Sequence, residues 1–259
     1  RKIRQRVTDP VVAEKLIPKD HGFGTRRLPL ESGYYEAYNR DTVRLVDINE
    51  TPIERITAQG LRTTAESFEF DVLIYATGFD GVTGPYDRMD IRGPGGRRLR
   101  DDWANGVPRT YLGMLVDGFP NLLMVLGPHT ARGNIPRNIE EIVDWLTGLV
   151  AFMQREGHRR VETRPAEVDR WVAEVEQAVE GLLFSEVNSW QTGINRNVEG
   201  RQVRRVLGYY GGAVEYRRRT DEVAAQGYAA LAITDECSVA GVVRAHTEAK
   251  RQGIALIIG

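Results

Sequence analysis

The chain has 259 residues, of which 41% are hydrophobic and 27% charged, with a formal net charge of -1. This near-neutral balance gives no field that would attract nucleic acid or an anionic membrane. The single cysteine, Cys237, excludes an intramolecular disulfide, which fits a reducing cytoplasm. No apolar run reaches the ~20 residues that span a bilayer, so we expect a cytoplasmic protein of one large or two small domains.

Alternating and unbroken apolar runs predict several strands in the first half of the chain, after one short helix over Asp9–Leu16. Each strand ends at polar or Gly/Pro turn residues. The predicted strands are Val43–Asp47, Ile53–Thr57, Phe68–Tyr75, Met89–Gly93 and Asn121–Gly127.

The second half is predicted to be mainly helical. Apolar residues recur at spacings of three and four from Ile139 to Met153, and again from Val168 to Leu182 after Pro165. Both apolar stripes are interpreted as core packing. Further on, Tyr228–Thr234, Ser238–Gln252 and Ile254–Ile258 predict strand, helix and strand, which together make one terminal βαβ unit.

The run FDVLIYATGFD, residues 70–80, is the most informative segment. Its Val, Leu, Ile and Tyr residues are typical of a strand buried on both faces of a parallel sheet. The small Ala76, Thr77 and Gly78 that follow let the backbone come close to a bound group, since glycine has no Cβ. Asp80 is interpreted as a structural residue of the turn and not as a base.

Two adjacent arginines, Arg26 and Arg27, follow a Gly-rich turn. A guanidinium is permanently charged and presents a planar fork of donors to a phosphate or an oxyanion. From charge alone, the pair is either a solvated basic turn or an anion clamp.

Together, VAEKLIPKDHGFGTRRLPLESGYYEAYNRDTVRLVD and ATGFD resemble the Baeyer–Villiger monooxygenases, a class B flavin monooxygenase family. The resemblance implies that Arg27 is the active-site arginine, which holds the flavin peroxide anion and contacts the nicotinamide. It implies that Arg26 approaches the phosphate or ribose of NADPH. Ala76, Thr77 and Gly78 would lie where the chain returns to the FAD-binding domain.

Asn188–Asn195 contains Trp190 in the pattern NSW-x-TG-x-N. A lone tryptophan is either a core residue or a cofactor contact, because the indole N–H donates while the ring packs. The resemblance implies that Trp190 contacts NADP.

Gly127–Glu140, GPHTARGNIPRNIE, joins a predicted strand to a predicted helix. It is either a simple joint or a helix start whose N–H groups face the flavin. The resemblance favours the second reading and assigns Gly127, Asn134 and Ile135 to cofactor binding. His129 and Arg132 are expected near the flavin or substrate pocket, without a catalytic role.

Several signatures are missing from the sequence. The four histidines have no metal-ligand spacing, so no metal site is expected. The GxGxxG fingerprints and the FxGxxxHxxxWP signature of the resembling family do not occur. We therefore expect a fragment, the C-terminal half of such an enzyme, that does not turn over alone.

The C-terminal segment has a different sequence pattern from the rest of the chain. GYAALAITDECS and AGVVRAHTEAKRQGIALIIG resemble the polymerase-and-histidinol-phosphatase domain of error-prone bacterial DNA polymerase III alpha chains. The resemblance would place Asp235 in a metal pocket, but Glu236 stands where working sites have His. The expected division is 1–221, monooxygenase, and 222–259, a βαβ tail. A chimera, a frame-shifted product, a designed recombinant and a natural monooxygenase with an unusual terminus remain open.

The sequence therefore predicts an α/β fold, part of a two-dinucleotide-binding flavoprotein. The expected activity is FAD- and NADPH-dependent conversion of a ketone and O₂ to an ester or lactone. The ketone is not specified, and neither a nucleic-acid nor a membrane partner is expected. The alternatives are a polymerase-type fragment fused to a monooxygenase remnant and a silent scaffold.

Overall fold

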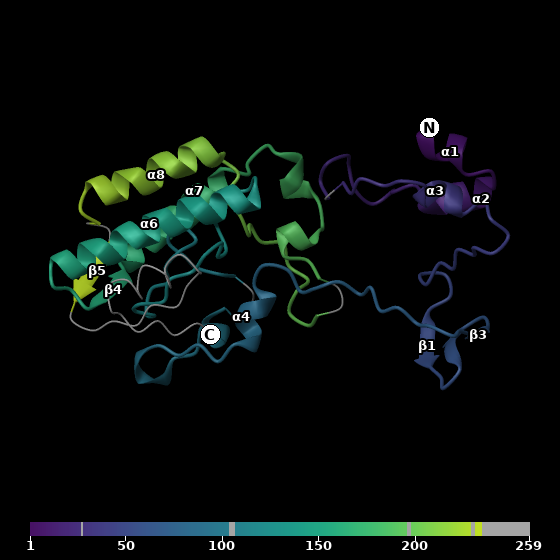
Figure 1. The fold of residues 1–259 in the computed structure, drawn as a ribbon, viewed down its shortest axis with the longest axis horizontal. Helices are drawn as coiled ribbons and strands as arrows, with labels where there is room; N and C mark the ends of the chain where they lie inside the picture. The colour runs from purple at the N-terminus through teal and green to yellow at the C-terminus, as the bar shows by residue number, and fades with distance from the viewer. Residues whose placement is uncertain (27, 104–106, 196–197, 229–230, 235–259) are drawn as a thin grey trace. The chain divides into compact units, whose positions relative to one another are not determined.

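The computed structural model describes the chain except residues 27, 104–106, 196–197, 229–230 and 235–259. It divides into two compact units, Arg1–Gly78 and Phe79–Gly259 (Figure 1). Each unit is described by itself. The boundary expected near residue 221 lies inside a helix of the second unit, Ala213–Ala225.

Three short helices begin the first unit: α1 (Lys2–Arg6), α2 (Pro10–Leu16) and α3 (Tyr34–Ala37). Asp9 caps α2, because its carboxylate accepts the N–H groups of Val11 and Val12 at 2.7 and 3.2 Å. Pro10 suits a first helical turn, where its missing N–H costs nothing. The predicted helix over Asp9–Leu16 is confirmed.

A three-stranded antiparallel sheet follows, with β1 (Ile53–Ile56), β2 (Gly60–Thr63) and β3 (Ser67–Glu69) in that order. Gly60 is required at its place, because a Cβ there would lie 2.1 Å from the carbonyl oxygen of Phe68. The prediction of a strand at residues 53–57 is confirmed.

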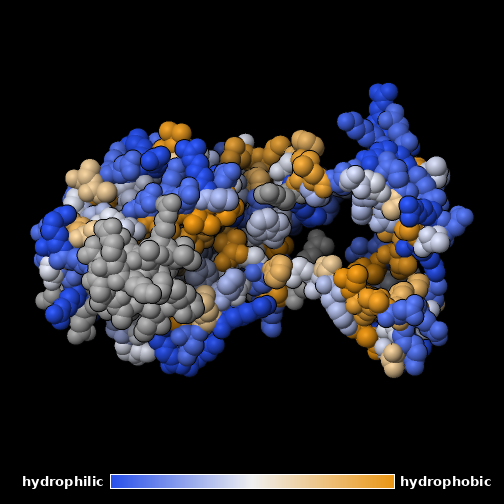
Figure 2. All heavy atoms as spheres, in the orientation of Figure 1, coloured by the Kyte–Doolittle hydropathy of each residue, from blue (hydrophilic) through white to orange (hydrophobic). Residues whose placement is uncertain are grey.

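The prediction of a strand through Tyr75 is wrong, because β3 ends at Glu69. Val72 and Ile74 are 74% and 82% exposed. Strand backbone needs neighbours for its N–H and C=O groups, and no described strand pairs with residues 71–78. The strand expected at Val43–Asp47 is irregular for the same reason. Apolar side chains such as Ile53, Ile56 and Phe70 are exposed on this unit (Figure 2).

The second unit is built on α6 (Ile135–Arg155), α7 (Pro165–Gln177) and α8 (Ala213–Ala225), which lie side by side (Figure 1). An antiparallel pair, β4 (Arg160–Thr163) and β5 (Leu231–Thr234), accompanies them. Short elements complete the unit: α4 (Gly84–Arg88), η1 (Pro94–Gly96), α5 (Leu99–Asp102), η2 (Leu183–Glu186) and η3 (Trp190–Thr192). Helix and sheet together confirm the α/β class.

The main core confirms the first predicted helical stripe. It confirms the second as far as Gln177, where α7 ends, whereas Leu182 lies beyond the helix and is 41% exposed. Ile142, Leu149 and Met153 of α6 and Val168 and Trp171 of α7 are buried in one apolar cluster. Helix α8 is fastened to α6 by the indole of Trp145, which donates to the carbonyl oxygen of Thr220 at 2.8 Å.

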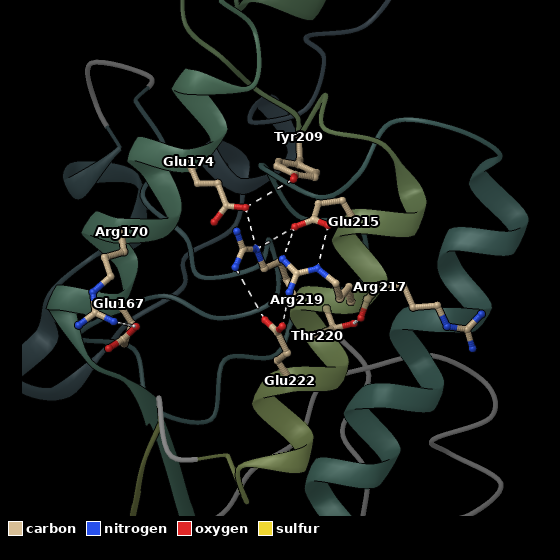
Figure 3. A network of polar contacts seen from close by, with 10 residues as sticks. Glu167, Arg170, Glu174, Tyr209, Glu215, Arg217, Arg219, Thr220 and Glu222 are labelled. Carbon is tan, nitrogen blue, oxygen red and sulfur yellow. Dashed lines mark hydrogen bonds and ion pairs between the residues drawn. The ribbon is translucent and has the colours of Figure 1, made fainter.

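Ion pairs fasten α8 to α7 on the other side. Arg219 of α8 contacts Glu174 of α7 at 2.9 Å, and the Tyr209 hydroxyl lies 3.5 Å from the same carboxylate (Figure 3). Arg219 also contacts Glu215 and Glu222 of its own helix. Because these groups are partly exposed, each pair adds little stability alone, but together they fix how α8 lies against α7.

Two predicted strands of this unit are wrong. Residues 89–93 form only an isolated bridge between Arg92 and Arg98. Residues 121–127 are turns, with Asn121 and Leu126 at positive φ, and their backbone is paired singly, as in Met124 N–H to Met114 O at 2.8 Å. Apolar runs of this length bury side chains without requiring a ladder.

The predicted terminal strand is confirmed as β5, which pairs with β4 in antiparallel register, Val161 opposite Ile233. The helix expected at residues 238–252 and the strand expected at 254–258 lie outside the described residues. Within the described part of the chain, no helix has the length and apolar content to cross a membrane.

We predict that Leu149→Ala lowers the free energy of unfolding of the second unit by about 2–5 kcal/mol, because it leaves a cavity in the core. Leu149 is 0% exposed in α6, whereas Val214 of α8 is 87% exposed. Val214→Ala is the control and changes stability by about 0.5 kcal/mol or less. Urea unfolding followed by tryptophan fluorescence measures both, and equal effects would contradict this core.

Candidate cofactor-binding site

The basic pair follows a tight turn in the first unit. The Thr25 hydroxyl donates to the carbonyl oxygen of Gly22 at 2.6 Å, and Gly24 adopts a φ of 79° that favours glycine. Arg26 donates to Asp20 at 2.8 Å. The hydrogen bond from His21, together with the charge of Arg26, lowers the pKa of Asp20. Arg27, the predicted catalytic residue, lies outside the described residues.

Ala76, Thr77 and Gly78 are exposed, at the end of the unpaired run. Gly78 has a φ of 81°, and a Cβ built there would have nothing within 4 Å. Glycine is therefore needed for its backbone conformation, while the space beside it is open to a bound group. The cofactor approach predicted for Ala76, Thr77 and Gly78 stays a prediction.

Trp190 begins η3 in the second unit, where a capping box holds the turn. The Ser189 hydroxyl accepts the N–H of Gln191 at 3.2 Å, and the Thr192 hydroxyl accepts the N–H of Ser189 at 2.9 Å. Ser189 and Thr192 are both buried, so the turn is anchored in the interior of the unit.

The Trp190 ring lies against Gly81, where a Cβ would come within 3.2 Å of the indole Cε3. Trp190 is 44% exposed, whereas Trp103, Trp145 and Trp171 are buried. An exposed indole laid over a glycine is not a core residue. Part of the side chain is open to solvent, and an indole N–H can donate a hydrogen bond.

The Gly127–Asn134 loop is fixed by packing at Gly127 and by a helix cap at Asn134, and its predicted cofactor role stays a prediction. Gly127 is needed for packing, because a Cβ there would lie 2.4 Å from the carbonyl oxygen of Gly113. Asn134 caps α6 by accepting the N–H of Arg137 at 3.1 Å. Because Pro136 has no N–H, the first turn offers a ligand at most the N–H groups of Asn134 and Ile135, both of which are exposed.

His129 is a buried structural residue of this loop. Its Nε2 donates to the carbonyl oxygen of Val206 at 3.1 Å, and its Nδ1 lies 3.1 Å from the Thr110 hydroxyl. Burial lowers the pKa of His129 to about 4. The imidazole is therefore neutral at pH 7 and serves to join three segments.

Residues 205–209 connect the loop to the Trp190 turn. The N–H of Arg205 donates to the carbonyl oxygen of Thr192 at 2.9 Å, and the N–H of His129 donates to that of Leu207 at 3.3 Å. Arg132 donates to Leu207 as well, from its guanidinium at 3.2 Å. The structure thus brings the Trp190 turn and the Gly127–Asn134 loop together through one shared segment.

Sequence reasoning missed two supporting residues, Gly81 and Arg201. Arg201 is buried and forms ion pairs with Asp80, at 3.7 Å, and with Asp87. Asp80 is therefore a structural residue of its turn. In the sequence Arg201 stands between Gly200 and Gln202, and this local context does not reveal partners more than a hundred positions away.

Each unit has a group of a type that binds dinucleotides. The second unit has an exposed indole, which can pack on a flat ring, and the first unit has an arginine, which can pair with a phosphate. Among the residues that the structure describes, no group of three or more His, Cys, Asp or Glu side chains could hold a metal ion.

Comparison with known proteins identifies the relatives. No family model matches the chain. It is 46% identical over 232 residues to 2-oxo-Δ3-4,5,5-trimethylcyclopentenylacetyl-CoA monooxygenase of Pseudomonas putida, covering 88% of this chain and 42% of that protein. It is 41% identical over 231 residues to a Baeyer–Villiger monooxygenase of Pseudooceanicola batsensis, covering 89% and 41%.

The chain is a homologue of part of the Baeyer–Villiger monooxygenases. It spans about two fifths of the length of the curated relatives it matches. Among solved structures, a closed cyclohexanone monooxygenase matches with a TM-score of 0.83 at 39% identity, covering 90% of this chain and 43% of the other. An oxidised steroid monooxygenase bound to NADP matches with a TM-score of 0.79 at 41% identity, covering 90% and 44%.

We predict that His129 makes the second unit sensitive to acid. Its folded pKa of about 4 lies below the value of 6.5 that is usual for a free histidine, so the unfolded state binds more protons between these two pH values. The contribution of His129 to the free energy of unfolding is fully present above pH 6.5. It decreases by about 3 kcal/mol as the pH is lowered to 4. His129→Gln keeps a donor without titrating and removes this part of the pH dependence.

Urea unfolding of both proteins at pH 7 and pH 4, followed by tryptophan fluorescence, measures the difference. Other titrating groups contribute equally to both proteins and cancel. Parallel pH dependences would contradict the burial of His129 as a neutral group.

Proposed function

We propose that residues 1–259 are part of an FAD- and NADPH-dependent Baeyer–Villiger monooxygenase that converts a ketone and O₂ to an ester or lactone. The observation that supports this most directly is the match over 90% of the chain to a structure described as a complex with FAD and NADP, at a TM-score of 0.82 and 45% identity. The exposed, pre-positioned Trp190 supports the same proposal.

In this proposal, the described donors hold the two cofactors. Ala76, Thr77 and Gly78 are proposed to approach FAD with open backbone, and Gly127, Asn134 and Ile135 are proposed to contact FAD from the loop that leads into α6. FAD, when bound, supplies the electron transfer and the activation of O₂. The contribution of the chain is to bind, orient and exclude water.

NADP is proposed to lie against Trp190 and Arg26. The Trp190 indole donates to a ribose hydroxyl or carboxamide, and Arg26 meets the phosphate or ribose. Arg26 now pairs with an exposed Asp20, a contact of small net value that a phosphate can replace.

Arg27 is proposed as the catalytic arginine. Its place beside Arg26 puts a second permanent cation in the same short segment. A fixed guanidinium in a water-poor site stabilises negative charge that develops on oxygen, an effect worth roughly 10² to 10³ in rate.

The substrate is proposed to be a ketone of unspecified class, because the relatives bear names from acetone monooxygenase and cyclopentanone 1,2-monooxygenase to 2-oxo-Δ3-4,5,5-trimethylcyclopentenylacetyl-CoA monooxygenase. We propose a cytoplasmic location and no nucleic-acid partner. For residues 227–259 we retain the likeness to a polymerase III alpha domain as a proposal about ancestry. Sequencing the coding DNA across codons 215 to 259 and beyond tests it.

Reassembly tests the function. The chain alone is expected neither to bind FAD nor to oxidise NADPH, and to gain both abilities when the remaining three fifths of the Pseudomonas putida relative are supplied. Ester or lactone formation from a ketone panel is measured by gas chromatography. An assembly that binds FAD and NADPH but oxygenates no ketone would contradict the proposed function.

Arg27→Ala is predicted to lower the rate of product formation in that assembly by roughly 10² to 10³, with FAD still bound. Arg155→Ala removes an exposed arginine at the end of α6 that pairs with Glu156, and it serves as the matched control with unchanged rate. If Arg27→Ala lowers the rate by less than tenfold, another residue stabilises the anion.

Trp190→Phe is predicted to raise the KM for NADPH about tenfold. The aromatic ring remains, but the indole N–H is lost, and with it a hydrogen bond that contributes about 1.4 kcal/mol. The kcat at saturating NADPH should change little. Steady-state kinetics of the assembled enzyme separate the two parameters, and an unchanged KM would remove Trp190 from the NADP contacts.

A further inference from the structure

The second unit buries a cation that the cofactor contacts do not use. Arg201 is 5% exposed. Its Nε lies 3.7 Å from an oxygen of Asp80, and its Nη2 donates to Asp87. Burying an unpaired guanidinium costs free energy, so the buried position of Arg201 requires the two carboxylates. Burial raises the pKa of Asp87, and the charge of Arg201 opposes the rise.

The same contacts tie two segments that are distant in sequence. Besides Arg201, Asp80 meets Asn195, whose side-chain amide donates to it at 3.3 Å. The backbone of Asn195 in turn donates to the carbonyl oxygen of Arg201 at 2.8 Å. Asp80 is therefore held from two sides by the segment that directly follows the Trp190 turn.

Asp80 opens a strained turn. Val82, a β-branched residue, has a φ of 63°, and the N–H of Thr83 donates to the carbonyl oxygen of Gly81 at 2.8 Å. Such a γ-turn with positive φ is rare, and it persists only where its surroundings determine it. Gly84 leaves room for Asp80, since a Cβ there would lie 2.6 Å from the Asp80 Cβ.

The strained turn also positions Trp190. The indole packs against Gly81, which lies between Asp80 and Val82. The buried ion pair therefore fixes both sides of one contact: Asp80 holds the glycine, and Arg201 holds the segment that begins with the tryptophan.

We infer that Asp80 and Arg201 are positioning residues for Trp190, and that their ion pair fixes the indole over Gly81. The consequence for cofactor affinity rests on the proposed function, in which Trp190 meets NADP. Asp80 and Arg201 themselves act only through the tryptophan.

Tryptophan fluorescence of the 259-residue chain tests the inference. Each variant is measured with and without Trp190→Phe, and subtraction gives the emission and acrylamide quenching of Trp190 alone. Arg201→Met and Asp80→Asn are expected to shift this difference emission to the red and to raise its quenching constant. Arg201→Lys keeps the charge without the fork, so it should fall between wild type and Arg201→Met.

Two controls separate positioning from general destabilisation. Arg217→Met removes an exposed arginine of α8 that pairs with Glu141 and should leave the Trp190 signal unchanged. The double variant Asp80→Asn with Arg201→Met should shift Trp190 no further than either single variant, because residues that act as one pair are not additive. Near-UV circular dichroism verifies that the core stays folded, and Asp80→Asn carries the test if Arg201→Met unfolds.

A folded Asp80→Asn or Arg201→Met variant with wild-type Trp190 emission and quenching would overturn the inference. Titration with NADP⁺, read by the same difference signal, bears on the function separately. Weakening of about tenfold in Arg201→Met is expected if Trp190 is an oriented contact. Displacement of Trp190 without any change in NADP⁺ affinity would uphold the positioning pair and contradict the role proposed for the tryptophan.

Discussion

The constraint on which the structure depends is that a strand cannot satisfy its own backbone. Residues 71–78 have the composition of a buried strand, yet their N–H and C=O groups meet no described ladder, and Val72 and Ile74 face solvent. Burying these side chains without pairing the backbone would cost more than it gains. The segment therefore stays extended and open, with Ala76, Thr77 and Gly78 at its end.

The second unit meets the same constraint with helices, which pair their backbone internally. Its core of α6, α7 and α8 is complete in itself, and it supports the Trp190 turn and the Gly127–Asn134 loop through residues 205–209. This explains why the contacts around Trp190 are ordered although the chain spans only two fifths of its relatives. These contacts hold Trp190 and the Gly127–Asn134 loop in place within the second unit.

Much of the helical structure could be predicted from sequence, because caps and apolar periodicity are local signals: Asp9 and Asn134 mark helix starts that the structure shows. The strands at 70–75 and 121–127 could not, because an apolar run does not say whether a neighbour exists. At the site, the sequence indicated Trp190 but not the packing of its ring against Gly81. The Asp80–Arg201 pair depends on tertiary contact alone, and Arg27 lies outside the described residues.

The central claim is that residues 71–78 stay unpaired in this chain because no described strand lies beside them, and that on the proposed function they pair only when the rest of the monooxygenase is supplied. Amide hydrogen exchange followed by mass spectrometry tests it most directly, in the chain alone and after assembly with the remaining part and FAD. The account predicts rapid exchange of residues 71–78 in the chain alone and at least about 10²-fold slowing in the assembly, as expected for a paired strand. Protection already present in the isolated chain, or unchanged exchange in an assembly that oxygenates ketones, would contradict it.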